Sequence, residues 1–109
     1  MSKKNKISAS HILIMHKESQ NSRSELSVEE AKKKIDDIYN DISSGKVKFA
    51  DAAVKNSNCP SGQSGGSLGE FTKGMMVKAF EDVSFSLDIE QISEPFESEF
   101  GFHIVKRDK

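Results

Sequence analysis

Between residues 7 and 16 the sequence ISASHILIMH alternates in the way that is typical of a β-strand, whose successive side chains point to opposite faces. One face would carry the odd-numbered residues of this stretch, and the other would carry Ile12 and Ile14. Because apolar residues occur on both faces, we expect both faces to be covered. The pattern therefore predicts a strand in the centre of a sheet.

A helical pattern begins after a polar loop. Residues Ser27 to Glu30 read SVEE, which matches the capping box of a helix N-terminus. Apolar residues then recur three or four positions apart from Val28 to Ile42, until Gly45 ends the run. A second, shorter helix is predicted from Phe49 through about Lys55, because a polar Asn-Ser-Asn cluster follows.

The second half of the chain predicts three short strands and one more helix. The strands cover about residues 67–71, 92–96 and 102–107, and residues 98–101 join the last two. The helix is indicated by the i, i+4, i+7 spacing of Met76, Phe80 and Val83. The resulting order, β-α-α-β-α-β-β, predicts an α+β fold.

Glycine is concentrated between Asn58 and Phe80. This segment holds five of the seven glycines and the only cysteine, Cys59. Glycine permits left-handed backbone conformations and close approach of main chain to main chain, so we expect a loop of defined shape here.

Charge and composition restrict the partners. The 16 Lys and Arg residues nearly balance the 17 Asp and Glu residues, and the formal net charge is -1. Such a chain has no overall field that attracts nucleic acid or an anionic membrane. The longest apolar run, residues 12–15, is too short to cross a bilayer. We therefore expect neither nucleic acid nor a membrane as a partner.

A chain of 109 residues is long enough for one domain. We expect residues 1–6 to form a flexible basic tail and residues 7–109 to form a single domain that works as a monomer. The sequence MSKKNK is not followed by the apolar stretch of a secretory signal, and one cysteine cannot form an internal disulfide. Both features favour a cytoplasmic protein.

Four blocks of the sequence carry a resemblance to a known family. They are SHILI at 10–14, GGSLGEF at 65–71, GMMVKAFED at 74–82 and SEFGFHIVKR at 98–107. In this order and spacing they resemble the parvulins, a family of peptidyl-prolyl cis/trans isomerases. The stretch CPSGQSGGSLGEF is particularly similar to the small stand-alone bacterial parvulins. The resemblance implies a four-stranded antiparallel sheet surrounded by helices, and isomerase activity that assists protein folding.

Such an activity needs few chemical groups in the site. Rotation about an X-Pro bond must overcome a barrier of about 18 to 20 kcal/mol, because the twisted amide loses its resonance. The twisted amide is less charge-separated than the planar one, so an apolar socket that removes the bond from water favours the midpoint. No covalent bond breaks, and we expect no cofactor and no metal.

The resemblance assigns residues to this socket. Leu68, Met76 and Phe80 match the proline socket of the family, and Phe71 lies beside them in the expected site. Phe100 and Val77 stand where phosphorylation-directed parvulins usually have polar residues. We therefore expect an apolar subsite for the residue before proline.

Three further residues match the catalytic positions of the family. His11 and His103 match its paired histidines, and we expect a structural and electrostatic role because isomerisation transfers no obligatory proton. Cys59 matches a position held by Cys or Asp, and would be a polar neighbour of the rotating carbonyl. Two residues without a match, His16 and Met75, are expected to be solvated and partly exposed, respectively.

The loop after the first strand, KESQNSRSEL, bears on the substrate. Phosphorylation-dependent parvulins carry a basic cluster there, whereas this loop has only Lys17 and Arg23, interleaved with Glu18 and Glu25. The sequence therefore predicts an isomerase for X-Pro bonds of unphosphorylated, unfolded or extended chains. Two alternatives remain: a non-catalytic peptide-binding or chaperone module, and a metal or redox site built from His11, Cys59 and His103.

Overall fold

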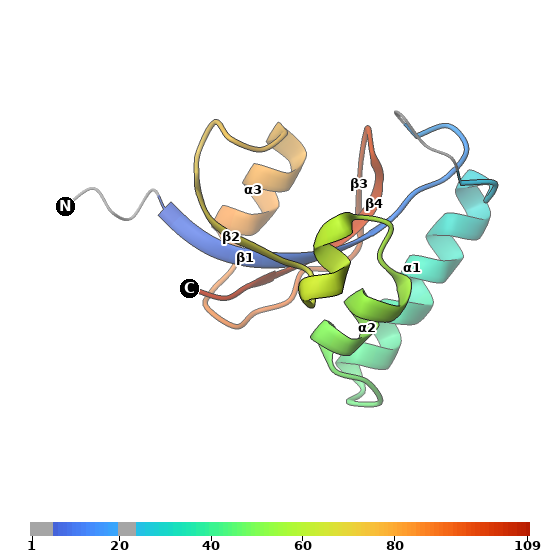
Figure 1. Ribbon diagram of the computed structural model, residues 1–109, viewed down its shortest axis with the longest axis horizontal. Coiled ribbons are helices and arrows are strands. Elements are labelled where there is room, and N and C mark those ends of the chain that lie inside the picture. The colour runs from blue at the N-terminus through green and yellow to red at the C-terminus, as the bar shows by residue number, and fades with distance from the viewer. Residues whose placement is uncertain (1–5, 20–23) are drawn as a thin grey trace.

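The computed structural model describes residues 6–19 and 24–109 (Figure 1). The elements in chain order are β1 (Lys6–Ile14), α1 (Val28–Ser43), α2 (Phe49–Asn56), the 3-10 helix η2 (Pro60–Ser64), β2 (Ser67–Thr72), α3 (Lys78–Ser86), β3 (Phe96–Ser98) and β4 (Gly101–Arg107). The four strands form one sheet in the order β2-β1-β4-β3, and all neighbouring strands are antiparallel. The predicted fold class, including the four-stranded antiparallel sheet, is confirmed.

The predicted position of the first strand is also confirmed, because β1 lies between β2 and β4. Its two faces belong to two different cores. Ile12 and Ile14 pack with the buried residues of α1 and α2, whereas Ile7 and Ala9 pack with Phe80 of α3 and other residues on the opposite face. Figure 1 shows this division, with α1 and α2 on one side of the sheet and α3 on the other. The sheet therefore separates a larger core from a smaller one.

The capping box forms as predicted. The Ser27 hydroxyl accepts a hydrogen bond from the Glu30 backbone N–H at 3.1 Å, and the Glu30 carboxylate accepts one from the Ser27 N–H at 2.8 Å. These two contacts satisfy N–H groups that have no partner within the helix. The polar sequence before the first apolar residue thus fixes where α1 begins.

Three expectations were wrong. The strand expected over residues 92–96 is a single bridge, Ile92 to Lys106, and β3 begins only at Phe96. Pro95 interrupts the run because it has no N–H for a strand ladder. The helix expected to include Met76 begins at Lys78, since Val77 is still extended, with φ -63° and ψ 151°.

The third wrong expectation concerns His16, which is buried instead of solvated and is only 5% exposed. β1 ends at Ile14, and the chain then turns so that the His16 ring lies against Phe102 of β4, with ring centroids 5.7 Å apart. The strand period alone could not show this, because the burial depends on a residue far away in the sequence. Residues 1–5 of the expected basic tail lie outside the described residues, and the last residue of that tail, Lys6, begins β1.

Candidate active site

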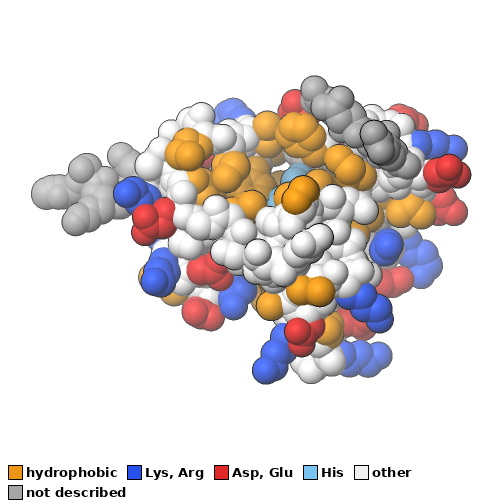
Figure 2. Space-filling model, viewed as in Figure 1, with side chains coloured by type: hydrophobic (Ala, Val, Ile, Leu, Met, Phe, Trp, Pro, Cys, Tyr) orange, Lys and Arg blue, Asp and Glu red, His pale blue; other side chains and the backbone are white. Residues whose placement is uncertain are grey.

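An apolar cavity of about 410 Å³ opens between the sheet and α3. Ten side chains from separate parts of the chain line it: His11, Leu13, Cys59, Leu68, Met75, Met76, Val77, Phe80, Phe100 and His103. Figure 2 shows this hollow, with hydrophobic side chains gathered around it and a histidine visible inside. Seven of the eight site residues predicted from the sequence are therefore brought together here.

Each wall comes from a different element. The neighbouring strands β1 and β4 supply the two histidines, and β2 supplies Leu68. The loop before α3 supplies the methionines at 75 and 76, and the turn between β3 and β4 supplies Phe100. Because these contributions are scattered along the chain, the cavity exists only when the sheet has formed.

Phe80 forms the centre of the apolar wall. It is 3% exposed, and its ring meets His11 and His103 edge to face, with centroid separations of 5.4 Å and 5.7 Å. The eighth predicted residue, Phe71, is 2% exposed and is not among the lining residues. Its ring lies 5.9 Å from that of Phe80. The structure thus places Phe71 in the core, where it supports Phe80.

The two histidines form a neutral pair. Their Nδ1 atoms lie 3.3 Å apart, and the rings stack with an interplanar angle of 23°. Burial lowers the pKa of His11 to about 4. Burial, together with the proximity of His11, lowers the pKa of His103 to about 3. At neutral pH one Nδ1 therefore carries a proton and donates a hydrogen bond to the other, and the pair brings no charge into the cavity.

Ser98 orients the ring of His103. The Ser98 hydroxyl lies 2.7 Å from His103 Nε2, and it also accepts a hydrogen bond from the Phe100 N–H at 3.1 Å. Ser98 thus connects the histidine pair to the turn that carries an apolar wall of the cavity. The sequence did not assign Ser98 to the site, although its position as the first residue of the predicted turn is a signal that could have suggested it.

Cys59 is held by the polar residues around it. Its sulfur accepts a hydrogen bond from the Ser61 hydroxyl at 3.1 Å, and its backbone N–H donates to the Ser57 hydroxyl at 3.3 Å. The Ser57 hydroxyl also accepts the Leu13 N–H, at 3.0 Å. Ser57 thereby connects the cysteine to β1, and both Cys59 and His11 line the cavity. The polar cluster before Cys59 was interpreted from the sequence only as a helix stop, and its second role depends on β1.

The rest of the glycine-rich loop fits closely against the same strand. The His11 N–H donates to the Gly66 carbonyl at 2.9 Å, and Gly66 has a φ of +87°. A Cβ at this position would lie 2.4 Å from the His11 carbonyl oxygen, which no side chain can tolerate. The loop therefore needs glycine here for both its backbone conformation and its approach to β1.

Two lining residues were not assigned to the site from the sequence, Leu13 and Met75, whereas Val77 was expected at the apolar subsite and lines the cavity. Leu13 follows His11 at the strand period of two, which is a signal that could have found it. Met75 is 63% exposed, as expected, and forms part of the rim of the cavity.

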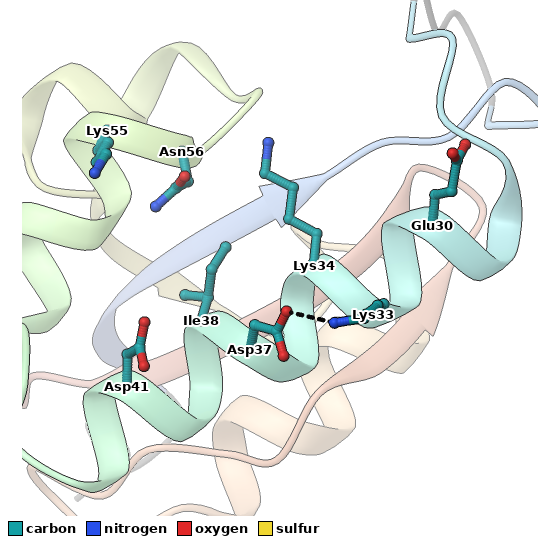
Figure 3. A pocket seen from close by; sticks show the side chains of 8 residues that line it. All are labelled: Glu30, Lys33, Lys34, Asp37, Ile38, Asp41, Lys55 and Asn56. Carbon is teal, nitrogen blue, oxygen red and sulfur yellow. Dashed lines mark hydrogen bonds and ion pairs between the residues drawn. The ribbon is translucent and has the colours of Figure 1, made fainter.

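A second hollow lies along α1 and α2 and has a different character (Figure 3). It has a volume of about 380 Å³, and charged side chains of both signs line most of it. Lys33 and Asp37 pair across one turn of α1 at 3.1 Å. Since the charges compensate one another, this hollow does not favour a particular ligand. In the part of the chain that the structure describes, no group of three or more His, Cys, Asp or Glu residues could hold a metal ion.

Comparison with known proteins agrees with this geometry. A family model described as "Rotamase: PPIC-type PPIASE domain" matches residues 11–109. The chain is 42% identical over 108 residues to the peptidyl-prolyl cis-trans isomerase pin1 of Schizosaccharomyces pombe, a match that covers 94% of this chain and 62% of that protein. It is 35% identical over 117 residues to Pin1 of Arabidopsis thaliana, and 98% of each chain is covered.

The solved structure of TbPIN1 is also similar, with a TM-score of 0.87 and 35% sequence identity over the full length of both chains. The chain spans less than two thirds of the length of its Schizosaccharomyces pombe relative, but nearly the whole length of its Arabidopsis thaliana relative. Within the described residues, no helix is long and apolar enough to span a bilayer.

Proposed function

Since the chain belongs to the parvulin family of peptidyl-prolyl cis/trans isomerases, we propose that it accelerates the isomerisation of X-Pro bonds in unfolded or extended polypeptides and so assists their folding. The observation that carries the proposal is the apolar cavity with a neutral histidine pair among its lining residues. Leu68, Met76 and Phe80 would enclose the proline ring, and the unbranched methionine side chain can adapt to both isomers.

The proposed mechanism is electrostatic. An apolar cavity removes water from the planar amide, whose charge separation water stabilises, and so lowers the relative free energy of the twisted amide. A charged histidine would oppose this effect, and the lowered pKa values of His11 and His103 keep both rings neutral. Cys59 would place electron density beside the rotating carbonyl, and the two histidines would hold the wall behind it. No step of this mechanism requires a cofactor or a metal.

The proposed substrates carry an apolar residue before proline and no phosphate. Phe100 and Val77 line the cavity, and no lysine or arginine is among its lining residues in the described part of the chain. Of the two cations in the loop after β1, Lys17 is exposed, and Arg23 lies outside the described residues. Among the described residues, a phosphate at this cavity would therefore lose water without gaining a bidentate partner.

We also propose that the protein acts as a monomer in the cytoplasm. Its one cysteine is free and half-buried at the cavity, a state that a reducing compartment maintains. Among the described residues, the large apolar side chains that are exposed are Val54, Met75 and Ile89.

Exchange NMR on short peptides tests the proposed function. We expect the folded chain to accelerate cis/trans exchange in a Leu-Pro peptide, and to do so at least about tenfold better than in the matched phosphoserine-Pro peptide, a difference of about 1.4 kcal/mol. Exchange no faster than in buffer, with a protein whose amide spectrum shows it to be folded, would leave only a binding module. Preference for the phosphorylated peptide would contradict the apolar subsite.

A further inference from the structure

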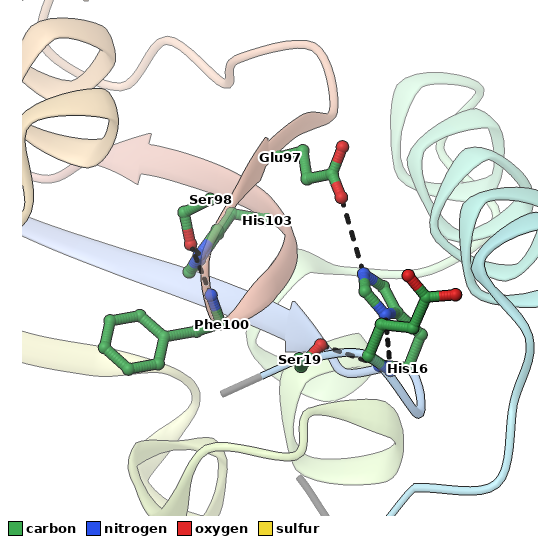
Figure 4. Close-up of polar contacts among 7 residues, drawn as sticks. His16, Ser19, Glu97, Ser98, Phe100 and His103 are labelled. Atoms are coloured by element: carbon green, nitrogen blue, oxygen red, sulfur yellow. Dashed lines mark hydrogen bonds and ion pairs between the residues drawn. The ribbon is translucent and has the colours of Figure 1, made fainter. Parts of the chain in front are cut away.

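The buried His16 is not part of the cavity, and its contacts are well defined. Its Nδ1 accepts a hydrogen bond from the Glu18 backbone N–H at 3.2 Å, and its own backbone N–H donates to the Ser19 hydroxyl at 3.0 Å (Figure 4). The ring is covered by Phe102 of β4. His16 thus holds the start of the loop after β1 against the sheet.

These contacts determine which nitrogen of His16 carries the proton in the neutral ring. Because Nδ1 accepts the Glu18 N–H, it has a lone pair there, and the proton must lie on Nε2. The Nε2 atom lies 3.4 Å from a carboxylate oxygen of Glu97 and is otherwise without a hydrogen-bond partner among the described residues. The His16 side chain is 6% exposed and that of Glu97 is 53% exposed. A buried donor therefore faces a carboxylate that reaches it from β3.

Glu97 is the middle residue of β3. This strand has only three residues, and Glu97 is paired with Phe102 while the next residue, Ser98, is paired with Gly101. Successive residues of a strand face opposite sides of the sheet. Figure 4 shows the result, with Glu97 pointing to His16 and Ser98 lying at His103 and Phe100. The contact between Glu97 and His16 thus fixes one side of β3. On the other side of the strand, Ser98 holds Phe100 through a hydrogen bond.

The backbone of the β3–β4 turn also contacts the end of β1. Gly101 has a φ of +130°, and a Cβ there would lie 2.5 Å from the Ile14 carbonyl oxygen and 2.9 Å from the Met15 Cα. The β3–β4 turn therefore rests directly on the end of β1, immediately before His16. Two contacts hold the turn on this side, one through the backbone at Gly101 and one through the pair of His16 and Glu97, in addition to the hydrogen bonds of Ser98.

We propose that His16 is a positioning residue which, through Glu97 and Ser98, fixes Phe100 at the subsite for the residue before proline. The inference rests on the proposed isomerase function and adds a determinant of substrate selectivity outside the cavity. The contact matters most for substrates whose side chain before proline is large enough to reach Phe100. Glycine at that position makes no such contact.

Two substitutions remove the contact from opposite ends. His16→Asn keeps an acceptor near the Glu18 N–H but is too short to reach Glu97, and Glu97→Ala removes the acceptor, which a Gln at this position would keep. His16→Gln restores a donor of suitable length. Glu99→Ala is the matched control, because it makes the same change two residues further along the chain, where no ion pair of this side chain occurs among the described residues.

The experiment compares kcat/KM for Leu-Pro and Gly-Pro peptides. We expect His16→Asn and Glu97→Ala each to lower the Leu-Pro value at least threefold more than the Gly-Pro value, the double variant to be no worse than either single one, and His16→Gln to recover most of the loss. Glu99→Ala should keep the wild-type ratio. Equal losses on both peptides, or an unchanged ratio in Glu97→Ala, would overturn the proposal.

A structural measurement separates this proposal from the function on which it rests. The NMR shifts of the Phe100 ring should move in Glu97→Ala and not in Glu99→Ala, whether or not the wild-type chain is active. If the wild-type chain is inactive on both peptides, the proposed function fails while these shifts still decide the positioning role. Unchanged ring shifts in Glu97→Ala would contradict it.

Discussion

Phe80 is 3% exposed, lines the cavity and also belongs to the smaller core, where Phe71 supports it from behind. Met76, in contrast, is only half-buried and packs against the same core from the edge. At the scale of single residues the site is therefore continuous with the core, and a substitution there changes both stability and the shape of the cavity. Cys59 is the exception, because polar contacts hold it in place.

Substitution of Cys59 tests its proposed role. If it only places electron density beside the carbonyl, Cys59→Asp should keep activity within about tenfold of wild type, and Cys59→Ala should lose on the order of 100-fold because the polar partner is gone. Exchange NMR on the Leu-Pro peptide measures both. Cys59→Ser, which retains size and a polar atom, serves as the conservative control.

A covalent attack by the thiolate gives a different result. Cys59→Asp and Cys59→Ser would then be as inactive as Cys59→Ala, because neither supplies the thiolate. That result would refute the electrostatic mechanism.

At the scale of elements, short segments position the site through their backbones. The loop between α2 and β2 reaches β1 at Gly66, and the β3–β4 turn reaches the end of the same strand at Gly101. Both approaches are closer than a side chain permits. The central strand therefore aligns the loop that carries Cys59 and the turn that carries Phe100 with its own residue His11, and all three line the cavity.

Gly66→Ala and Gly69→Ala form a matched pair that tests this close approach. Both glycines have left-handed φ values, +87° and +74°, but a Cβ at Gly69 meets nothing within 4 Å. We expect Gly69→Ala to lower the free energy of unfolding by about 1 kcal/mol through backbone strain alone. Gly66→Ala should lower it by at least about 2 kcal/mol more, because the loop must move away from the His11 carbonyl.

Urea unfolding measures the stabilities, and peptide exchange measures the activity. The movement of the loop should also displace Cys59, so Gly66→Ala should be less active than Gly69→Ala at temperatures where both are folded. Equal stability and equal activity of the two variants would show that the close approach has no role.

At the scale of the whole molecule, the sheet buries two neutral histidines in its smaller core. Burial keeps their pKa values at about 4 and about 3, below the value of about 6.5 of an imidazole in an unfolded chain. Below pH 6.5 the unfolded chain therefore binds more protons than the folded chain. The contribution of these histidines to the free energy of unfolding is therefore fully present above pH 6.5, and it is lost as the pH falls toward 4.

We therefore expect the free energy of unfolding to fall between pH 7 and pH 5, with a contribution of up to about 1.4 kcal/mol per pH unit from each histidine. Urea unfolding at several pH values gives this slope, and His103→Gln should make it shallower. Activity should stay flat from about pH 8 to pH 6, where both rings remain neutral. A slope that His103→Gln leaves unchanged would assign the pH dependence to other groups.

The sequence by itself determined the local features of this protein. The capping box set the start of α1, the alternation set β1 with its two covered faces, and four motifs indicated the family and seven of the cavity residues. These features depend on neighbours within a few positions or on residues whose spacing is characteristic, so they can be read without knowing the fold.

Only the tertiary structure decided which residues meet across the sheet. Phe71 and Phe80 are both buried, but the pairing of β1 with β2 puts the first behind the second. His16 is buried because β4 places Phe102 against it, and β3 places Glu97 within reach. The two contacts of His16 join residues some 80 positions apart in the sequence. Their geometry follows from strand register and backbone approach, which local sequence patterns do not encode.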